Sequence, residues 1–214
     1  MTYRAIVPVK TLTAAKSRLA DHLSAYQRQR LVLYMLHHVL DILHASEIFE
    51  CISVVSADDT VLKKAQSWGA TALVEELAGH NPALHAAALR EREAGASSLL
   101  TISADLPLLK VTDIHTMVAY GTTHPIVLAS SREGTGTNAV LMRPPLALPY
   151  LFGVGSLQSY QKAARQRGLS AQLYQSEGLA LDVDTIEDLH ELQLRGKCFF
   201  GEWHDTLPAH SRIC

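Results

Sequence analysis

The sequence predicts a single-domain α/β protein in which a mostly parallel central sheet is flanked by helices. Short apolar segments of strand length alternate with segments of helical periodicity before residue 120, an order typical of βαβ units with right-handed crossovers. The apolar segment Leu99–Ser103 has the length of a strand and shows no clean polar alternation, which indicates a strand covered on both faces. No internal repeat or low-complexity linker divides the chain, so we expect one domain.

Length, charge and cysteine usage exclude several classes of function. A chain of 214 residues buries roughly 70% of its unfolded surface and needs no disulfides. The net charge is −2 and no basic block occurs, so a nucleic-acid polymer is not an expected partner. No apolar stretch approaches a membrane span or a signal-peptide core, and the three cysteines are scattered, which favours a reducing compartment. We therefore expect a cytoplasmic protein without a membrane partner.

The first half of the chain is predicted to form strands separated by helices with recognisable ends. Ser24–Gln27 is a capping-box pattern that begins a helix, and Gly69 suits the position just after a helix. Pro82 favours the first turn of an alanine-rich helix that runs to about Gly95. The predicted strands of this half are Ala5–Val9, Ile52–Ser56, Ala70–Val74 and Leu99–Ser103.

The second half continues the alternation less regularly. A short helix begins at Thr112, and a longer one covers residues 157–167. Leu181–Asp184 is predicted to end another strand, and Thr185–Asp188 is a capping pattern that begins a helix through about Leu194. The remaining predicted strands are Ile126–Ala129 and Asn138–Met142.

Asp105 lies just past the carboxyl end of the predicted strand Leu99–Ser103, and Pro107 stops that strand. Open α/β sheets bind ligands at this edge, and a carboxylate there is costly unless it meets a metal, a cation or water. An Asx turn with Pro107 explains the residue equally well. Position alone therefore leaves a site and a turn as alternatives.

Three cationic side chains, Lys10, Lys16 and Arg18, follow the first predicted strand. At the same edge of the sheet they would surround an anion, helped by backbone N–H groups. A solvated basic loop is the alternative. The segment is not a Walker motif, because Gly-x-x-x-x-Gly-Lys is absent.

Two aspartates and two glycine-rich segments could complete a site. Asp182 and Asp184 offer hard oxygen ligands, which together with Asp105 suit magnesium bound with a phosphorylated substrate. A charge favoured at the start of a helix is the alternative for Asp184. Gly134–Thr137 and Gly153–Ser156 allow close backbone approach and offer hydroxyl donors, although each alone also fits an ordinary turn.

Several segments carry these residues in a fixed order along the chain, and together they resemble a known family. They are Pro8–Lys10, Ala15–Leu19, Ala104–Leu108, Gly136–Asn138, Phe152–Ser156 and Leu181–Thr185. In combination these segments resemble the phospholactate guanylyltransferases, enzymes of deazaflavin coenzyme F(420) biosynthesis. The resemblance covers about residues 4–194, which is nearly the whole chain.

The resemblance implies a fold, a reaction and a set of substrates. The fold would be a Rossmann-like nucleotidyltransferase domain over residues 1–194, with a tail, residues 195–214, of unassigned role. A phosphorylated three-carbon acid would attack the α-phosphate of GTP, and pyrophosphate would leave. The acid would be 2-phospho-L-lactate, phosphoenolpyruvate or 3-phospho-D-glycerate, which the sequence does not distinguish. A homodimer is compatible with the family, and nothing in the sequence decides it.

The resemblance also implies roles for single residues. Lys16, Arg18 and Asp105 would carry catalysis, without a general base, because a phosphate oxygen is already ionised near neutral pH. His80 stands where relatives often carry a leucine before the residue matching Asn81. The implied contacts are Lys10, Lys16, Ser17, Arg18 and Asn81 for GTP, Thr137, Gly153 and Ser156 for the acid, and Asp105, Asp182 and Asp184 for magnesium.

Two other functions compete with this interpretation. A nucleotidyltransferase for another acceptor, such as a molybdopterin or a sugar phosphate, would typically carry a Leu-Ala-Gly-Gly-type loop where Pro8–Lys10 stands. A non-catalytic nucleotide-binding regulator of the same fold would not need Lys16, Asp105 and Asp184 together. Magnesium-dependent release of pyrophosphate from GTP and an acid separates an enzyme from a regulator.

Overall fold

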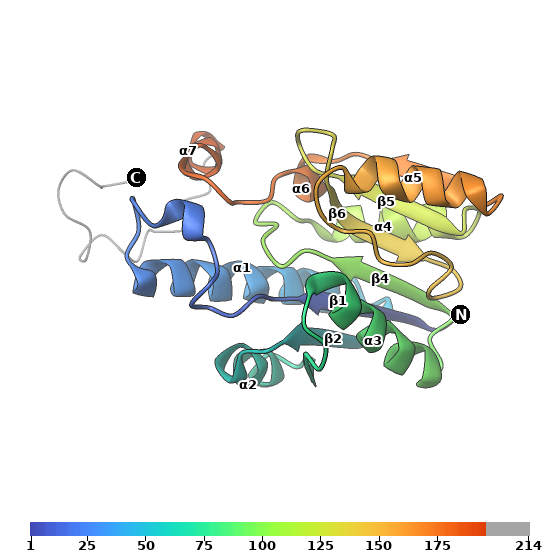
Figure 1. Ribbon diagram of the computed structural model, residues 1–214, viewed down its shortest axis with the longest axis horizontal. Helices are drawn as coiled ribbons and strands as arrows, with labels where there is room; N and C mark the ends of the chain where they lie inside the picture. The colour runs from blue at the N-terminus through green and yellow to red at the C-terminus, as the bar shows by residue number, and fades with distance from the viewer. Residues whose placement is uncertain (196–214) are drawn as a thin grey trace.

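Seven strands form the central sheet of the computed structural model, which describes residues 1–195 (Figure 1). In chain order they are β1 (Tyr3–Pro8), β2 (Phe49–Ser56), β3 (Thr71–Val74), β4 (Ser98–Ile102), β5 (Ile126–Ser130), β6 (Thr137–Met142) and β7 (Ala171–Tyr174). Across the sheet the order is β3-β2-β1-β4-β6-β5-β7. Only β6 runs antiparallel to its neighbours within this sheet, so the predicted fold class is confirmed.

Helices cover both faces of the sheet. They are the 3₁₀ helix η1 (Ser17–Leu19) and the α-helices α1 (Ala25–Ala45), α2 (Asp59–Ser67), α3 (His80–Glu93), α4 (Val111–Gly121), α5 (Ser156–Gln166), α6 (Glu177–Ala180) and α7 (Ile186–Leu194). Apolar side chains of α1, α2 and α4 form the core on one face, and those of α3 and α5 form the core on the other. A smaller cluster beneath α7 includes Leu19, Leu108 and Val183.

The predicted helix starts are confirmed where a side chain caps the backbone. Ser24 Oγ accepts the N–H of Gln27 at 3.2 Å, and Gln27 Oε1 accepts the N–H of Ser24 at 2.8 Å, which is the reciprocal bonding of a capping box. Thr185 and Asp188 bond in the same manner at the start of α7. The buried strand prediction also holds, since all residues of β4 are buried.

The predicted and observed strands differ in two places. Leu181–Asp184 is not a strand; its apolar side chains, Leu181 and Val183, instead enter the small cluster beneath α7. β7 has no counterpart among the predicted strands. It is a short edge strand of intermediate and exposed residues, so neither an apolar run nor clean alternation marks it in the sequence.

Other expectations concern membranes, cysteines and the tail. No helix within residues 1–195 is long and apolar enough to cross a bilayer. Cys51 is a free thiol, whereas Cys198 and Cys214 lie outside the described residues. The predicted tail also lies outside them, apart from Arg195.

Candidate active site

The predicted site segments converge at one edge of the sheet. Strands β1 and β4 are parallel, so the loop after β1 and the segment containing Asp105 leave the sheet on the same side. Strand β6 is antiparallel to β4, with Ala139 paired to Ile102, and the N–H of Ser103 donates to Asn138 O at 2.8 Å. The first residues of β6, including Thr137, therefore lie beside the carboxyl end of β4. In Figure 1 the chain enters β1 from the right, and the loop that follows it lies at the left with α7.

Lys16 is the centre of the charged cluster at this edge. Its Nζ donates to Asp105 Oδ2 at 2.5 Å and to Asp184 Oδ1 at 2.8 Å. The Lys16 side chain is only 7% exposed, whereas those of Asp105 and Asp184 are 25% and 46% exposed. The backbone of Lys16 is left-handed, with φ of 53°, a conformation that costs free energy for a residue with a Cβ. Asp105 and Asp184 thus lie on either side of one ammonium group, and their predicted role as magnesium ligands stays a prediction.

The protonation of this cluster follows from burial and charge. Burial alone would lower the pKa of Lys16, but the carboxylates of Asp105 and Asp184 raise it to about 12. For Asp184, burial opposes ionisation, but Lys16 together with the more distant Arg18 and Lys10 leaves its pKa below the usual value. Near neutral pH the cluster therefore holds a charged lysine beside an ionised Asp184.

Asp182 differs from the other two aspartates because no cation bonds to it within the described chain. Burial, with a further contribution from the Asp105 carboxylate, raises its pKa to about 6. Asn138 Nδ2 donates to Asp182 Oδ1 and also to the carbonyl of Leu179, each at 3.0 Å. Asn138 therefore fixes the Asp182 carboxylate next to the carboxyl end of β4.

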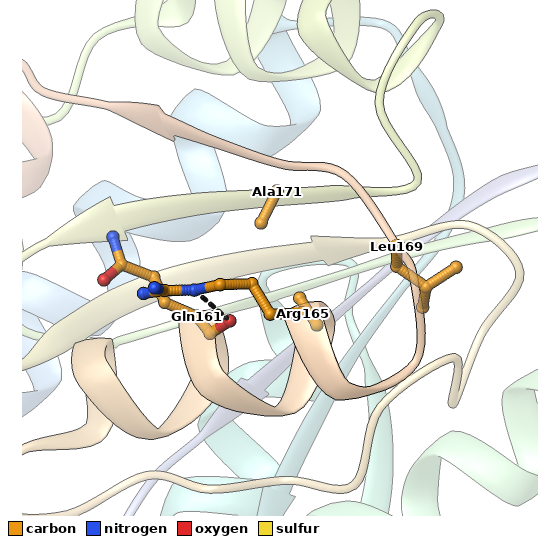
Figure 2. Close-up of a pocket in the computed structure, with 5 residues that line it drawn as sticks. Gln161, Arg165, Leu169 and Ala171 are labelled. Carbon is orange, nitrogen blue, oxygen red and sulfur yellow. Dashed lines mark hydrogen bonds between the residues drawn. The ribbon is translucent and has the colours of Figure 1, made fainter.

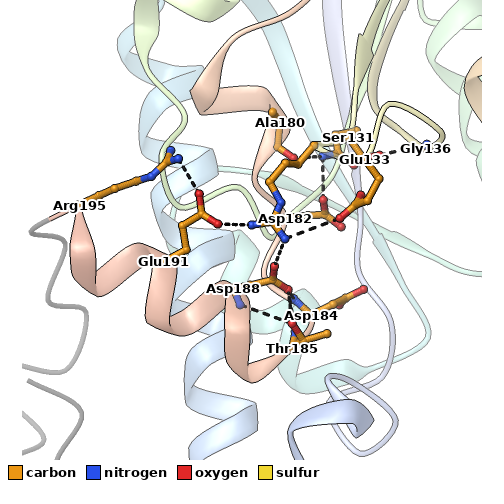
Figure 3. A network of polar contacts seen from close by, with 12 residues as sticks. Ser131, Glu133, Gly136, Ala180, Asp182, Asp184, Thr185, Asp188, Glu191 and Arg195 are labelled. Atoms are coloured by element: carbon orange, nitrogen blue, oxygen red, sulfur yellow. Dashed lines mark hydrogen bonds and ion pairs between the residues drawn. The ribbon is translucent and has the colours of Figure 1, made fainter.

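Asp188 shapes the turn that carries Asp184. Its Oδ2 accepts the N–H groups of Asp184 at 2.9 Å and Thr185 at 2.8 Å, and Arg132 donates to its Oδ1 at 2.8 Å. Arg132 also pairs with Glu191. Figure 3 shows this network joining α7 to the loop between β5 and β6, so the position of Asp184 depends on contacts outside the sheet.

The residues assigned to the acid lie on the β6 side of the edge. Thr137 and Ser156 are buried, and Ser156 Oγ donates to Thr137 Oγ1 at 3.1 Å. Gly153 has φ of 131°, which a residue with a Cβ rarely adopts. The N–H of Ser156 donates to Gly153 O at 3.1 Å, so Gly153–Ser156 forms a compact turn at the start of α5.

The residues assigned to GTP lie in different surroundings. Lys10, Ser17 and Arg18 are exposed, and the charge of Lys10 contributes to lowering the pKa of His80, after burial. Asn81 is partly buried and bonds to the backbone of Phe152 through both polar atoms of its side chain. The structure thus brings Lys16, Asp105 and Asp184 together, while Asn81 is engaged with the segment before Gly153.

Sequence reasoning missed Asn138, Asp188 and Arg132 as parts of this arrangement. Asn138 lies in Gly136–Asn138, one of the segments that carry the family resemblance. Its amide beside Thr137 was the available sequence signal. Asp188 was singled out only as part of a helix start, where an acidic residue is common. No sequence signal links Arg132 to Asp188, because their contact spans 56 residues.

A separate surface hollow lies at the other end of the strands, away from the candidate site. It has a volume of about 180 Å³ and is lined by α5 and β7 residues, among them Gln161, Arg165 and Ala171 (Figure 2). Ala171 pairs with Ile126, the first residue of β5, whereas the candidate site lies beyond the last. The hollow contains no carboxylate or nucleophile, so it is not part of the site.

Solved structures define the class of fold. A Desulfovibrio desulfuricans protein described as a nucleotide-diphospho-sugar transferase superposes with a TM-score of 0.78 at 14% identity, covering 94% of this chain and 90% of its own. A CMP:2-keto-3-deoxy-manno-octonic acid synthetase complexed with CTP gives 0.63 at 12% identity, covering 92% and 98%. A Mycobacterium tuberculosis protein in complex with manganese gives 0.56 at 15% identity, covering 90% and 98%. The fold is that of the nucleotidyltransferases.

Sequence comparison identifies the family within this class. The family model "Guanylyl transferase CofC like" matches residues 3–201. The chain is 42% identical to a phosphoenolpyruvate guanylyltransferase of Sphaerobacter thermophilus, covering 90% of this chain and 93% of that one. It is 32% identical to a 3-phospho-D-glycerate guanylyltransferase of Colwellia psychrerythraea, covering 88% and 90%. The chain belongs to the CofC-like guanylyl transferase family and is an enzyme that transfers nucleotidyl groups.

Proposed function

We propose that this enzyme transfers GMP from GTP to a phosphorylated three-carbon acid in the cytoplasm, as a step of coenzyme F(420) biosynthesis. An oxygen of the acid's phosphate attacks the α-phosphorus of GTP, the bond to the β-phosphate breaks, and pyrophosphate leaves. The observation that carries the proposal is the cluster of Lys16, Asp105 and Asp184 at the ligand-binding edge of a nucleotidyltransferase fold.

The carboxylates of this cluster fit a divalent cation, for which we propose magnesium. Lys16 shows that Asp105 and Asp184 together hold a positive charge, and the pKa of Asp182 is raised in part by the negative charge of Asp105. No group of three His, Cys, Asp or Glu side chains in residues 1–195 is arranged to hold a metal alone. Magnesium commonly binds through one or two carboxylates plus substrate phosphates, so this donor set suits an ion that arrives with GTP.

The proposed roles of the protein groups follow from their positions. Asp105 and Asp184, with Asp182 beside them, would hold magnesium, which neutralises phosphate charge when bound. Lys16 can turn its ammonium from the carboxylates to a phosphate oxygen, where the exposed side chains of Lys10, Ser17 and Arg18 add further contacts. Because the attacking oxygen is already ionised, these residues act by positioning and charge neutralisation rather than by proton transfer.

The acid-binding role is proposed for Thr137, Gly153 and Ser156. Buried hydroxyls on Thr137 and Ser156 can donate to carboxylate or phosphate oxygens, and Gly153 leaves its backbone open to a ligand. We expect phosphoenolpyruvate to be the best acid, because the relative at 42% identity carries that name while the 3-phospho-D-glycerate relative is 32% identical.

One assay tests the proposal. The purified protein is incubated with GTP, magnesium and each of the three acids in turn, and the guanylylated product and pyrophosphate are detected by mass. Product with one acid and its loss on chelation support the proposal. Sugar phosphates are tested as alternative acceptors. GTP binding without product from any acid or sugar phosphate would indicate a nucleotide-binding regulator instead.

Asp105→Asn tests the charged cluster on which the proposal rests, with little change in the shape of the side chain. Loss of this charge should lower kcat about a hundredfold or more, as removal of a preorganised electrostatic group does, with the melting temperature and secondary structure retained. Asp59→Asn is the matched control, because Asp59 is an exposed residue of α2. Equal kcat values for the two variants would contradict the assignment of Asp105.

A further inference from the structure

Asn81 and Phe152 are joined by a reciprocal pair of hydrogen bonds. Asn81 Nδ2 donates to Phe152 O at 3.0 Å, and the N–H of Phe152 donates to Asn81 Oδ1 at 3.0 Å. The carboxamide thus pairs with the backbone of Phe152 as a neighbouring strand would. Since the Oδ1 and Nδ2 atoms both serve this contact, one N–H of the side chain is left as a donor.

The ring of Phe152 is held on several sides. It stacks on Tyr150 with ring centroids 6.0 Å apart, and it meets the rings of Tyr160 and His80 edge-on at 5.7 and 5.5 Å. Tyr150 is itself bonded to Thr101 of β4 at 2.7 Å. Asn81 and this aromatic packing therefore fix the backbone of Phe152 relative to both α3 and the sheet.

The fixed segment leads directly into the proposed acid-binding turn. Gly153 follows Phe152, and the turn ends at Ser156, whose hydroxyl bonds to Thr137. Between these anchors, Val154 is fully exposed and Gly155 has φ of 67°. The turn is thus held at its two ends, by Asn81 on one side and by Thr137 on the other.

We infer that Asn81 is a positioning residue for the acid-binding turn rather than a reader of the guanine base. The inference deepens the proposed function and rests on it. Asn81 belongs to the first turn of α3, on the side of the molecule where the charge of Lys10 reaches His80. Asn81 therefore links the start of α3 to the proposed acid-binding turn. A residue on the GTP side of the site would thus help to support the acid pocket.

Asn81→Ala separates the two roles. It should raise the KM for the acid about tenfold, as loss of a pair of hydrogen bonds allows, with kcat and the GTP dissociation constant changed less than about twofold. Asn81→Asp keeps the acceptor for the Phe152 N–H but sets a carboxylate oxygen against the carbonyl of Phe152, so its acid KM should rise at least as much as that of Asn81→Ala. GTP binding is measured by calorimetry without acid, and the melting temperature is recorded for each variant.

His85→Ala is the matched control, because His85 is an exposed residue of the same helix; its kinetic constants should equal those of the wild type. A weaker GTP dissociation constant with an unchanged acid KM would make Asn81 a nucleotide contact and overturn the inference. Equal changes in both, or in neither, would also overturn it. A wild-type enzyme inactive with every acid overturns the proposed function itself, and the inference with it.

Discussion

Replacing Lys16 with methionine should make the protein bind a divalent metal more tightly while turning over more slowly. In the structure the ammonium of Lys16 lies at 2.5 and 2.8 Å from the carboxylates of Asp105 and Asp184. A metal that binds these carboxylates in the absence of GTP must replace both hydrogen bonds. Lys16→Met removes the competing cation and retains a side chain of similar length.

The magnitude follows from these two contacts. A hydrogen bond to a charged group contributes about 1.5–3 kcal/mol. Because the two carboxylates are 25% and 46% exposed, we expect the two hydrogen bonds of Lys16 together to contribute about this much rather than twice as much. One tenfold change corresponds to about 1.4 kcal/mol, so the metal dissociation constant should fall about 10- to 100-fold. Loss of the proposed phosphate contact should lower kcat/KM for GTP by a similar factor.

The assay is calorimetric titration of magnesium or manganese into nucleotide-free protein, with steady-state kinetics on the same samples. Arg18→Met is the control for charge alone, because Arg18 is exposed and only its longer-range charge acts on Asp184. Its metal affinity should change less than about fivefold. If Lys16→Met binds metal no more tightly than Arg18→Met, the lysine and the metal do not share the carboxylates.

Two further predictions concern stability. Asp182 has a pKa of about 6 against an ordinary 3.8, so the folded state resists its ionisation and loses stability as the pH rises from about 4 to 6. Asp182→Asn should therefore raise the free energy of unfolding of metal-free protein by up to about 3 kcal/mol at pH 7.5. The gain should vanish near pH 4 in denaturation curves, and a gain independent of pH would contradict this cause. Gly178→Ala should lower the free energy of unfolding by about 1–3 kcal/mol, because the new Cβ would clash with Asp113 Oδ2 and would lie 2.9 Å from Leu108 O. An unchanged or raised melting temperature would refute that clash.

Much of the fold could be predicted from local signals. The apolar segment Leu99–Ser103, which lacks clean polar alternation, predicts a strand, and the spacing of Ser24 and Gln27 predicts the start of α1, because burial and capping act over a few residues. β7 could not be predicted, since an edge strand has little apolar surface to bury. Leu181–Asp184 shows the converse: apolar side chains on an extended segment can fill a small core without pairing in a sheet.

The candidate site was predictable to the extent that it follows from strand direction. Asp105 and the loop with Lys16 follow parallel strands, and the carboxyl ends of such strands share an edge. The position of Asp184 follows no such rule, because a turn bonded to Asp188 sets it. The direct contact of Lys16 with two carboxylates, and of Asn81 with Phe152, depends on side-chain packing between distant segments, which the sequence pattern does not encode.

The reversed direction of β6 bears on how one scaffold can come to accept different acids. The chain reaches Thr137 through a hairpin loop, and Ser131 closes that loop by bonding to the backbone of Gly136. Loop residues other than Arg132, which bonds to Asp188, can be exchanged while the pairing of β6 with β4 and β5 stays in register. Lys16 and Asp105 follow the parallel strands β1 and β4, and the loop is linked to them through the contacts of Arg132 with Asp188 and of Asp188 with Asp184. Descendants of one ancestral enzyme can therefore diverge in acceptor while inheriting the same nucleotide chemistry.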